Sequence, residues 1–432
     1  MRMAALVRQT MFLSCSHFFV RVIGFVMRIW LSRELGPQAM GLVELAQSAQ
    51  MLLITPVISG LPAAVSRMSA KSDKPGQVRV LRCGLALALG VSLPLTAAAF
   101  CLREPLALWL GDVRTLPALV IYLPCIPILG ASCALNGYYY GTGRPVPPAL
   151  SEMLEQIVRF LLCLRLVTGL RGWPMMLRAA IPAAAALVGE TIGLLLMLLI
   201  ALKAIFFSRA SGSRRAVLRE MISLALPLTG MKLVHSLMRT VNATLIPARL
   251  QLSGLSAAES LSRLGMMNGM MMPVLMMPSF ITGSLCMVAA PELTRRQQDG
   301  RPLRNLVLRV LGATLGIGAM AMLAVYAAAP LIAQTLYRQA ELLPMLRRCC
   351  LLVPVLSLNQ VTGGMMNGLG LQSASLRISL VSSLLSVLLM YLLAALPALR
   401  LWGAILAMAC AQLLTLALSS RALLHAIGRR GK

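Results

Sequence analysis

Apolar stretches long enough to cross a bilayer as helices follow one another along almost the whole chain. A helix needs about 20 mostly apolar residues to span the hydrocarbon core. A window of about 19 residues places such stretches at 8–31, 40–66, 80–102, 115–140, 147–169, 179–205, 221–246, 262–290, 305–327, 343–368, 374–396 and 401–424. Because only 12% of the residues are charged, about half the share in a soluble globular protein, the sequence predicts an all-α integral membrane protein with about 12 transmembrane helices.

A polar segment with the composition of a linker lies near the middle of the chain, at 206–220. It divides the sequence into a first lobe, 1–205, and a second lobe, 221–432. Short dipeptides recur in the same order in both halves: Met27-Arg28 is echoed by Met238-Arg239, and Asn136-Gly137 by Asn367-Gly368. We therefore expect two pseudo-symmetric lobes of six helices around a central cavity near the membrane midplane.

Basic residues outnumber acidic ones strongly, with 40 Lys and Arg against 13 Asp and Glu. In a soluble protein this excess would suggest nucleic acid, but here most of the charges lie in short loops between apolar stretches. There they would meet anionic membrane lipids, so we predict no nucleic-acid partner. With the N-terminus inside, roughly twice as many basic residues fall on the cytoplasmic side as outside. This bias predicts a multi-pass protein of the cytoplasmic (inner) membrane with both termini in the cytoplasm.

Motifs of enzymes and metal sites are absent from the sequence. It contains neither a phosphate-binding GxxxxGK[ST] loop nor an HExxH motif, and its ten cysteines show no metal-ligand spacing. Methionines are frequent in 262–290, where they favour adaptable packing over copper binding. We therefore predict that the protein is not an enzyme and uses no cofactor or metal.

Cationic and polar side chains interrupt two apolar stretches. The first contains Arg21 and Arg28, which are seven residues apart and so share a helix face. The seventh carries a polar stripe at steps of three, four and three residues, formed by Lys232, His235, Arg239 and Asn242. Charges at membrane depth are costly and are functional candidates by default, and guanidinium groups match phosphate. We predict that Arg21, Arg28, Lys232, Arg239 and Asn242 bind a pyrophosphate headgroup, although the arginines could instead lie near an interface.

A smaller set of residues is a candidate for ion coupling or gating. Glu155 and Arg159 have the spacing and order of an intrahelical ion pair. Glu190 and Glu44 have no partner nearby in the sequence, so each would pair with an arginine of another helix or be protonated. The arginines that could pair with Glu190 or Glu44 are Arg21, Arg28 and Arg239. His235 could carry a proton or be a hydrogen-bonded structural residue, and the coupling ion would be H+ or Na+.

Prolines and a glycine interrupt the second and the eighth apolar stretch. They are Pro56, Gly60 and Pro62 in the one, and Pro273 and Pro278 in the other. Proline removes a backbone donor and kinks a helix. We therefore predict bends at these places, which could act as hinges during gating.

Four segments resemble a known family: FVRVIGFVMRIWLSRELG, VISGLPAAVSRMSAKSD, ISLALPLTGMKLVHSLMRTVNATLIPARL and GMMNGMMMPVLMMPSFITGSLCMVAAPELTRRQQDG. The chain is similar to the stage V sporulation protein B group of the multidrug/oligosaccharidyl-lipid/polysaccharide exporter superfamily, relatives of the lipid II flippase. The resemblance implies two six-helix lobes with a V-shaped cavity. It also implies outward movement of a lipid-linked sugar precursor by alternating access, powered by an ion gradient or the membrane potential.

Three functions are compatible with these features. The first is a flippase for a lipid-linked oligosaccharide or peptidoglycan precursor, with spore cortex or cell-wall synthesis as its setting. The second is a multidrug or organic-cation antiporter of the same superfamily, which would favour carboxylates and aromatic rings in its cavity. The third is a non-transporting membrane scaffold for wall synthesis, in which the buried charges are structural pairs only.

Overall fold

All regular elements in the described part of the chain are helices. The computed structural model describes residues 2–202, 205–206, 213–299 and 301–428. Within these residues nine helices are long and apolar enough to cross a membrane, or ten if the bent pair Ala257–Met276 and Ser279–Cys286 is one span. The all-α membrane fold is therefore confirmed, and the chain is a multi-pass membrane protein. The number of twelve spans stays a prediction.

Two of the expected spans account for the lower number. The stretches 8–31 and 40–66 are both largely contained in α1 (Arg2–Ile58), which is divided by non-helical backbone at Gly36, with φ 79° and ψ 169°. A glycine adopts this positive φ without a steric penalty. Together with the next helix, α1 counts as one candidate span, Cys15–Lys71. The stretch 147–169 forms α7 (Val146–Gly169), which is long enough to span but carries more charged residues than an apolar span does.

By packing, the chain forms two compact units, Met1–Thr240 and Val241–Lys432. Most of α9 (Arg214–Leu252) therefore packs with the first unit. The linker predicted at 206–220 lies partly outside the described residues, and residues 214–220 are the first turns of α9. The assignment of six helices to each lobe stays a prediction.

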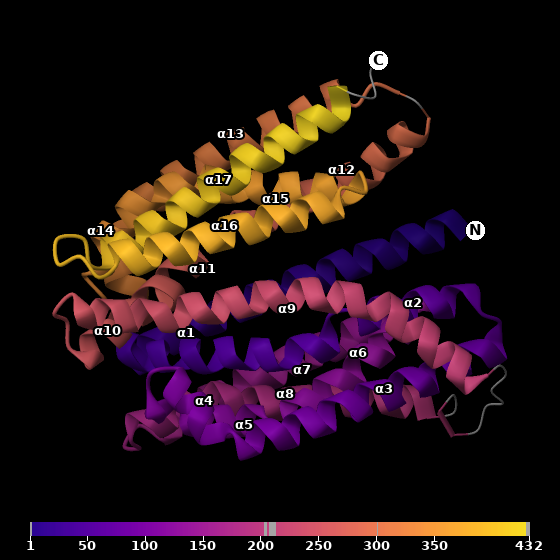
Figure 1. The fold of residues 1–432 in the computed structure, drawn as a ribbon, viewed down its shortest axis with the longest axis horizontal. Coiled ribbons are helices and arrows are strands. Elements are labelled where there is room, and N and C mark those ends of the chain that lie inside the picture. Colours follow the sequence, from indigo (N-terminus) through magenta and orange to yellow (C-terminus); the bar gives the residue numbers. More distant parts are fainter. Residues whose placement is uncertain (1, 203–204, 207–212, 300, 429–432) are drawn as a thin grey trace. The chain divides into compact units, whose positions relative to one another are not determined.

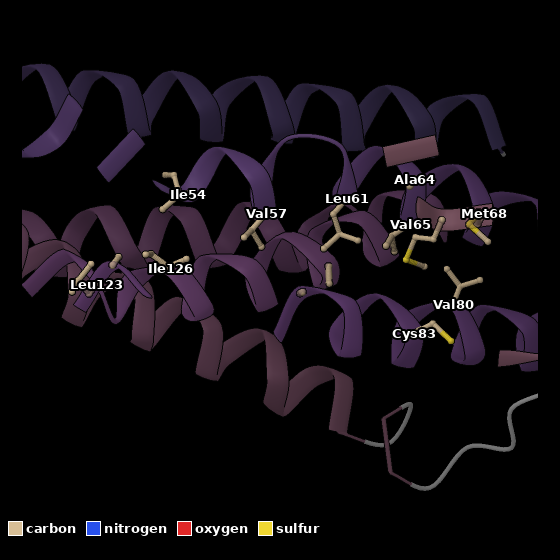
Figure 2. Packing of buried hydrophobic residues seen from close by; sticks show 14 residues of the cluster. Ile54, Val57, Leu61, Ala64, Val65, Met68, Val80, Cys83, Leu123 and Ile126 are labelled. Carbon is tan, nitrogen blue, oxygen red and sulfur yellow. The ribbon is translucent and has the colours of Figure 1, made fainter. Parts of the chain in front are cut away.

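The first unit is built around α6, α7 and α8 (Figure 1). After α1 come α2 (Leu61–Lys71), α3 (Lys74–Cys101), α4 (Arg103–Trp109), η1 (Val113–Thr115), α5 (Leu116–Tyr122), α6 (Cys125–Gly141), α7 and α8 (Met175–Leu202). Helix α6 packs against α2, α3 and α8, and α7 packs against α8 and α1. Figure 2 shows the apolar cluster between these helices, in which Val57, Val65 and Ile126 are almost fully buried.

Pairs of glycines four residues apart bring neighbouring helices of this unit into close contact. In α6, a Cβ on Gly137 would lie 2.6 Å from the Pro62 carbonyl oxygen. In α8, a Cβ on Gly193 would lie 2.8 Å from the Ser151 hydroxyl of α7. Small residues at such spacing allow membrane helices to approach closely. These contacts fix α2 on α6 and α8 on α7.

The second unit is organised around α15. It contains the end of α9, then α10 (Ala257–Leu264), the π-helix η3 (Gly265–Met271), α11 (Met272–Met276), α12 (Ser279–Gln298), α13 (Arg304–Pro330), the π-helix η4 (Leu331–Leu336), α14 (Leu342–Cys349), η5 (Cys350–Leu352), α15 (Val353–Gly368), α16 (Gln372–Leu393) and α17 (Leu401–Gly428). Helix α15 contacts α12, α13 and α17, and α16 packs along α17. Val307, Val361 and Leu423 are among the buried residues of this core.

The chain bends at both sets of proline and glycine residues. Pro56 lies near the end of α1, Gly60 caps α2 after a break at residues 59–60, and Pro62 lies in the first turn of α2. Pro273 lies in the first turn of α11, Pro278 caps α12, and the bend at this break is 50°. The bends are observed, whereas their action as hinges stays a prediction.

The start of α3 offers a test of local stability. The side chain of Asp73 accepts a hydrogen bond from the Gly76 backbone N–H at 3.0 Å. Because Asp73→Ala leaves this donor without its cap, we expect a loss of about 1 kcal/mol in the free energy of unfolding. Thermal unfolding of the full chain in detergent would measure it. Asp73→Asn keeps an equivalent acceptor and should unfold near the wild-type midpoint, and an equal loss in both variants would contradict a capping role.

Candidate functional site

An ion pair spans the kink of α1. Arg28 lies before Gly36 and Glu44 after it, and the Arg28 guanidinium donates a hydrogen bond to the Glu44 carboxylate. The side chains are 28% and 10% exposed. The pair therefore joins the two segments of α1, and Glu44 has one of the three partners considered from the sequence. Arg28 is engaged with an acid rather than presented alone to a ligand.

A second cluster joins α7 to α8. Arg159 hydrogen-bonds to Glu155 one turn earlier in α7, and its Nη2 lies 2.9 Å from Glu190 Oε1 of α8. The side chains of all three residues are less than a quarter exposed. The ion pair predicted from the spacing of Glu155 and Arg159 is therefore present in the structure. One guanidinium here faces two carboxylates.

Glu190 does not pair with Arg21, Arg28 or Arg239, the arginines considered from the sequence. The reason is the close approach of α8 to α7, because a Cβ on Gly189 would lie 2.9 Å from the Glu155 carbonyl oxygen. This approach makes Arg159 the cation within reach of Glu190. The partner of Glu190 thus depends on how α7 and α8 pack, and the spacing of residues within one helix does not reveal it.

The first segment of α1 also meets α7 through polar groups. His17 Nδ1 lies 3.4 Å from Glu152 Oε2. One helical turn further along α7, the Gln156 side chain packs where Gly24 of α1 leaves room. Neither His17 nor Gln156 was among the site residues predicted from the sequence. The available signal was that both are polar residues within apolar stretches, where polar groups need partners.

The cationic stripe of α9 is presented on its surface. Lys232, His235 and Arg239 are exposed. A different face of the helix packs on α1, where the hydroxyl of the buried Thr240 donates a hydrogen bond of 2.9 Å to the Ser48 carbonyl oxygen. Arg21 of α1 is likewise exposed. Within the described residues, Lys232 and Arg239 form no ion pair with an acid, in contrast to Arg28 and Arg159.

Asn242, the last residue of the predicted stripe, belongs to the second unit. Its Oδ1 is buried and accepts no hydrogen bond from the described residues. The second unit also contains a polar contact that was not predicted from the sequence, in which Asn359 Nδ2 donates to Gln412 Oε1 at 2.8 Å. The predicted substrate-binding set therefore includes residues of both units. A cavity lined by them stays a prediction.

Comparisons with known proteins agree with this architecture. The chain is 25% identical over 419 residues to stage V sporulation protein B of Bacillus subtilis (strain 168), covering 92% of this chain and 79% of that protein. Its fold is similar to a multidrug resistance MATE family transporter of the MOP superfamily in an inward-facing conformation, with a TM-score of 0.74, 17% identity, and 95% and 94% of the two chains covered.

The fold is equally similar to the lipid II flippase MurJ in an inward closed conformation, with a TM-score of 0.74, 12% identity, and 97% and 89% of the two chains covered. The two-lobe fold expected from the sequence is thus the fold that these two solved structures share with the chain. From residue 6 to residue 297, the chain matches the model of one family. It therefore belongs to the family described as polysaccharide biosynthesis protein.

Proposed function

We propose that the protein is a flippase that moves a lipid-linked oligosaccharide or peptidoglycan precursor across the cytoplasmic membrane by alternating access. The similarity to stage V sporulation protein B over 92% of the chain carries this proposal. The fold shared with the lipid II flippase MurJ supports it. Spore cortex or cell-wall synthesis would be the corresponding setting, and the bias of basic residues supports a cytoplasmic location of both termini.

The pyrophosphate headgroup would be bound by Arg21, Lys232, Arg239 and Asn242. The exposed side chains of Lys232 and Arg239 support this role, because a cation at membrane depth that forms no ion pair with an acid of the described residues needs water or an anionic ligand. Arg28 differs from the others, since Glu44 already occupies its guanidinium. Arg28 would therefore reach the substrate only when its pair with Glu44 opens, which would couple headgroup binding to the kink of α1.

Ion coupling would reside in the Glu155–Arg159–Glu190 cluster, with His235 as a further candidate. Two carboxylates around one guanidinium leave one negative charge that H+ or Na+ could neutralise. The kink at Gly36 and the bends at Gly60 and Pro278 would then supply the movement.

Neutralising one exposed cation tests the binding role. Arg239→Gln should lower precursor movement about 10- to 100-fold, because it removes charge-assisted hydrogen bonds worth roughly 1.5–3 kcal/mol. Movement would be measured as externally accessible precursor in cells that lack the wild-type protein, with surface expression monitored. Arg165→Gln, which removes an exposed arginine of α7 outside the proposed set, should move the precursor normally.

Each alternative function has its own signature in the same cells. Normal precursor movement by Arg239→Gln would remove the proposed mechanism. Export of an organic cation that depends on Glu155 and Glu190 would indicate the antiporter, which the MATE fold supports less specifically. A defect in wall synthesis with unchanged precursor distribution in cells lacking the protein would indicate a scaffold.

A further inference from the structure

One end of the second unit gathers arginines from several elements. We name this group the arginine collar: Arg249, Arg263, Arg338, Arg347, Arg348 and Arg400. It lies at the end of the unit that carries α10, α14 and the turn between α16 and α17 (Figure 1). Two contacts tie its parts together, since Arg263 of α10 pairs with Glu341 before α14, and Arg348 of α14 lies over Trp402 of α17.

Three arginines of the collar are held by aromatic rings. The guanidinium carbon of Arg249 lies 3.5 Å from the centre of the Tyr391 ring. The corresponding distances are 4.6 Å for Arg348 over Trp402 and 5.6 Å for Arg347 over Tyr326. A ring holds the flat face of a guanidinium through cation–π attraction, and the N–H groups lie in the guanidinium plane. The Nε–H of Arg249 already donates to the Tyr391 carbonyl oxygen at 2.9 Å, so its terminal nitrogens are the donors left for a ligand. This arrangement prepares several donors for a phosphate.

The acids of the collar do not neutralise these three arginines. Glu341 pairs with Arg263, and Glu259 accepts hydrogen bonds from the backbone and the side chain of Ser256 as part of a capping box. Within the described part of the chain, neither acid forms an ion pair with Arg249, Arg347 or Arg348. The collar therefore keeps a positive charge that an anion can meet.

Backbone conformation provides a second, independent indication that the collar is a ligand site. Arg338 and Arg400 have φ of 54° and 47°, and they are the two non-glycine residues with positive φ in the described chain. Such a conformation favours glycine, so an arginine there costs free energy. Both belong to the collar, one between η4 and α14 and the other immediately before α17. Strained residues of this kind tend to gather at ligand sites.

The surroundings of the collar match a lipid rather than a soluble anion. Tyr326 and Tyr391 are about half exposed, as rings at a membrane interface are. Along the same helices, further from the collar end, Leu323 and Leu388 are 62% and 56% exposed. Acyl chains would cover these leucines while the phosphate meets the arginines. With the N-terminus inside, as the charge bias predicts, this end would face outside, where excess arginine is otherwise disfavoured.

We propose that the arginine collar is a binding site for the phosphate of an anionic membrane phospholipid of the phosphatidylglycerol class. Arg249, Arg347 and Arg348 supply the donors, and Tyr391, Tyr326 and Trp402 orient them. Arg338 and Arg400 add charge from the two strained turns. The site does not depend on the proposed transport function, because it uses none of the residues assigned to the precursor.

Lipid binding to the purified full-length protein tests the collar. The protein would be titrated with phosphatidylglycerol, and bound lipid would be counted by native mass spectrometry. The variant Arg347→Gln/Arg348→Gln should bind phosphatidylglycerol at least about tenfold more weakly. The control Arg304→Gln/Arg309→Gln removes the same charge from exposed arginines near the start of α13 and should bind as the wild type does.

The assignment would be overturned if the collar variant bound phosphatidylglycerol as tightly as the wild type, or if the control variant lost as much affinity as the collar variant. It would also be overturned if the protein bound undecaprenyl pyrophosphate but not phosphatidylglycerol. Folding is checked in phosphatidylcholine, where all variants should unfold at the wild-type temperature. If the double variant does not fold, Arg347→Lys/Arg348→Lys keeps the charge but loses the planar donors. That variant should bind more weakly than wild type, and wild-type affinity would contradict recognition by guanidinium.

Discussion

Gly60→Ala should prevent most of the protein from folding stably. A Cβ at this position would lie 2.1 Å from the Ala225 carbonyl oxygen and 2.7 Å from the Ala225 Cα. These are backbone atoms of α9, so no side-chain rotation can relieve the clash. Overpacking typically costs 1–3 kcal/mol and more where the backbone must shift, and we expect about 3 kcal/mol or more. Thermal unfolding in detergent and the yield of monodisperse protein would measure it.

Gly230→Ala is the matched control. Gly230 lies in α9, one residue after Thr229, and a Cβ on Gly230 would meet nothing within 4 Å. Alanine is the better helix former by roughly 1 kcal/mol, so this variant should be as stable as the wild type or slightly more so. A stable Gly60→Ala protein would mean that α9 moves away from the break at low cost. The interpretation that Gly60 and α9 form a fixed contact would then be wrong.

The sequence predicted those parts of the fold that depend on local chemistry. Hydropathy identified the helical stretches, because the bilayer leaves few alternatives for a backbone in oil. The bends at Gly60 and Pro278 could be predicted from the proline and glycine residues, because these residues change the backbone conformation at their own positions. The Glu155–Arg159 pair was also predictable, because one helical turn separates its members.

The remaining contacts of the candidate site depend on which helices touch. Glu190 contacts Arg159 because Gly189, which has no side chain, lets α7 approach α8 closely. His17 contacts Glu152 because α1 lies along α7. Neither pairing follows from spacing in one helix. Arg28 could be recognised as a charge at membrane depth, but the kink at Gly36 decides that Glu44 lies beside it. Prediction from sequence therefore found the Glu155–Arg159 pair and named Arg28 among three possible partners of Glu44, but it missed the contacts of Glu190 with Arg159 and of His17 with Glu152.

Removing the shared cation of the second cluster should destabilise the protein strongly. Arg159→Gln leaves Glu155 and Glu190 facing each other with less than a fifth of either side chain exposed. Breaking a buried ion pair by removing one partner costs about 3–5 kcal/mol, because the remaining charge is buried and unpaired. The unfolding temperature in detergent should fall accordingly. Arg165→Gln in the same helix removes an exposed arginine and should change it little.

A neutral version of the cluster separates stability from function. Arg159→Gln/Glu155→Gln/Glu190→Gln removes all three charges together and should recover most of the stability lost in Arg159→Gln, because hydrogen-bonding groups remain and no unpaired charge is buried. A triple variant as unstable as the single one would show that unpaired charge is not the cause. If the cluster couples transport to an ion, the triple variant should fold yet move precursor at a rate that no longer responds to the H+ or Na+ gradient. A normal response to both gradients would leave the cluster a purely structural role.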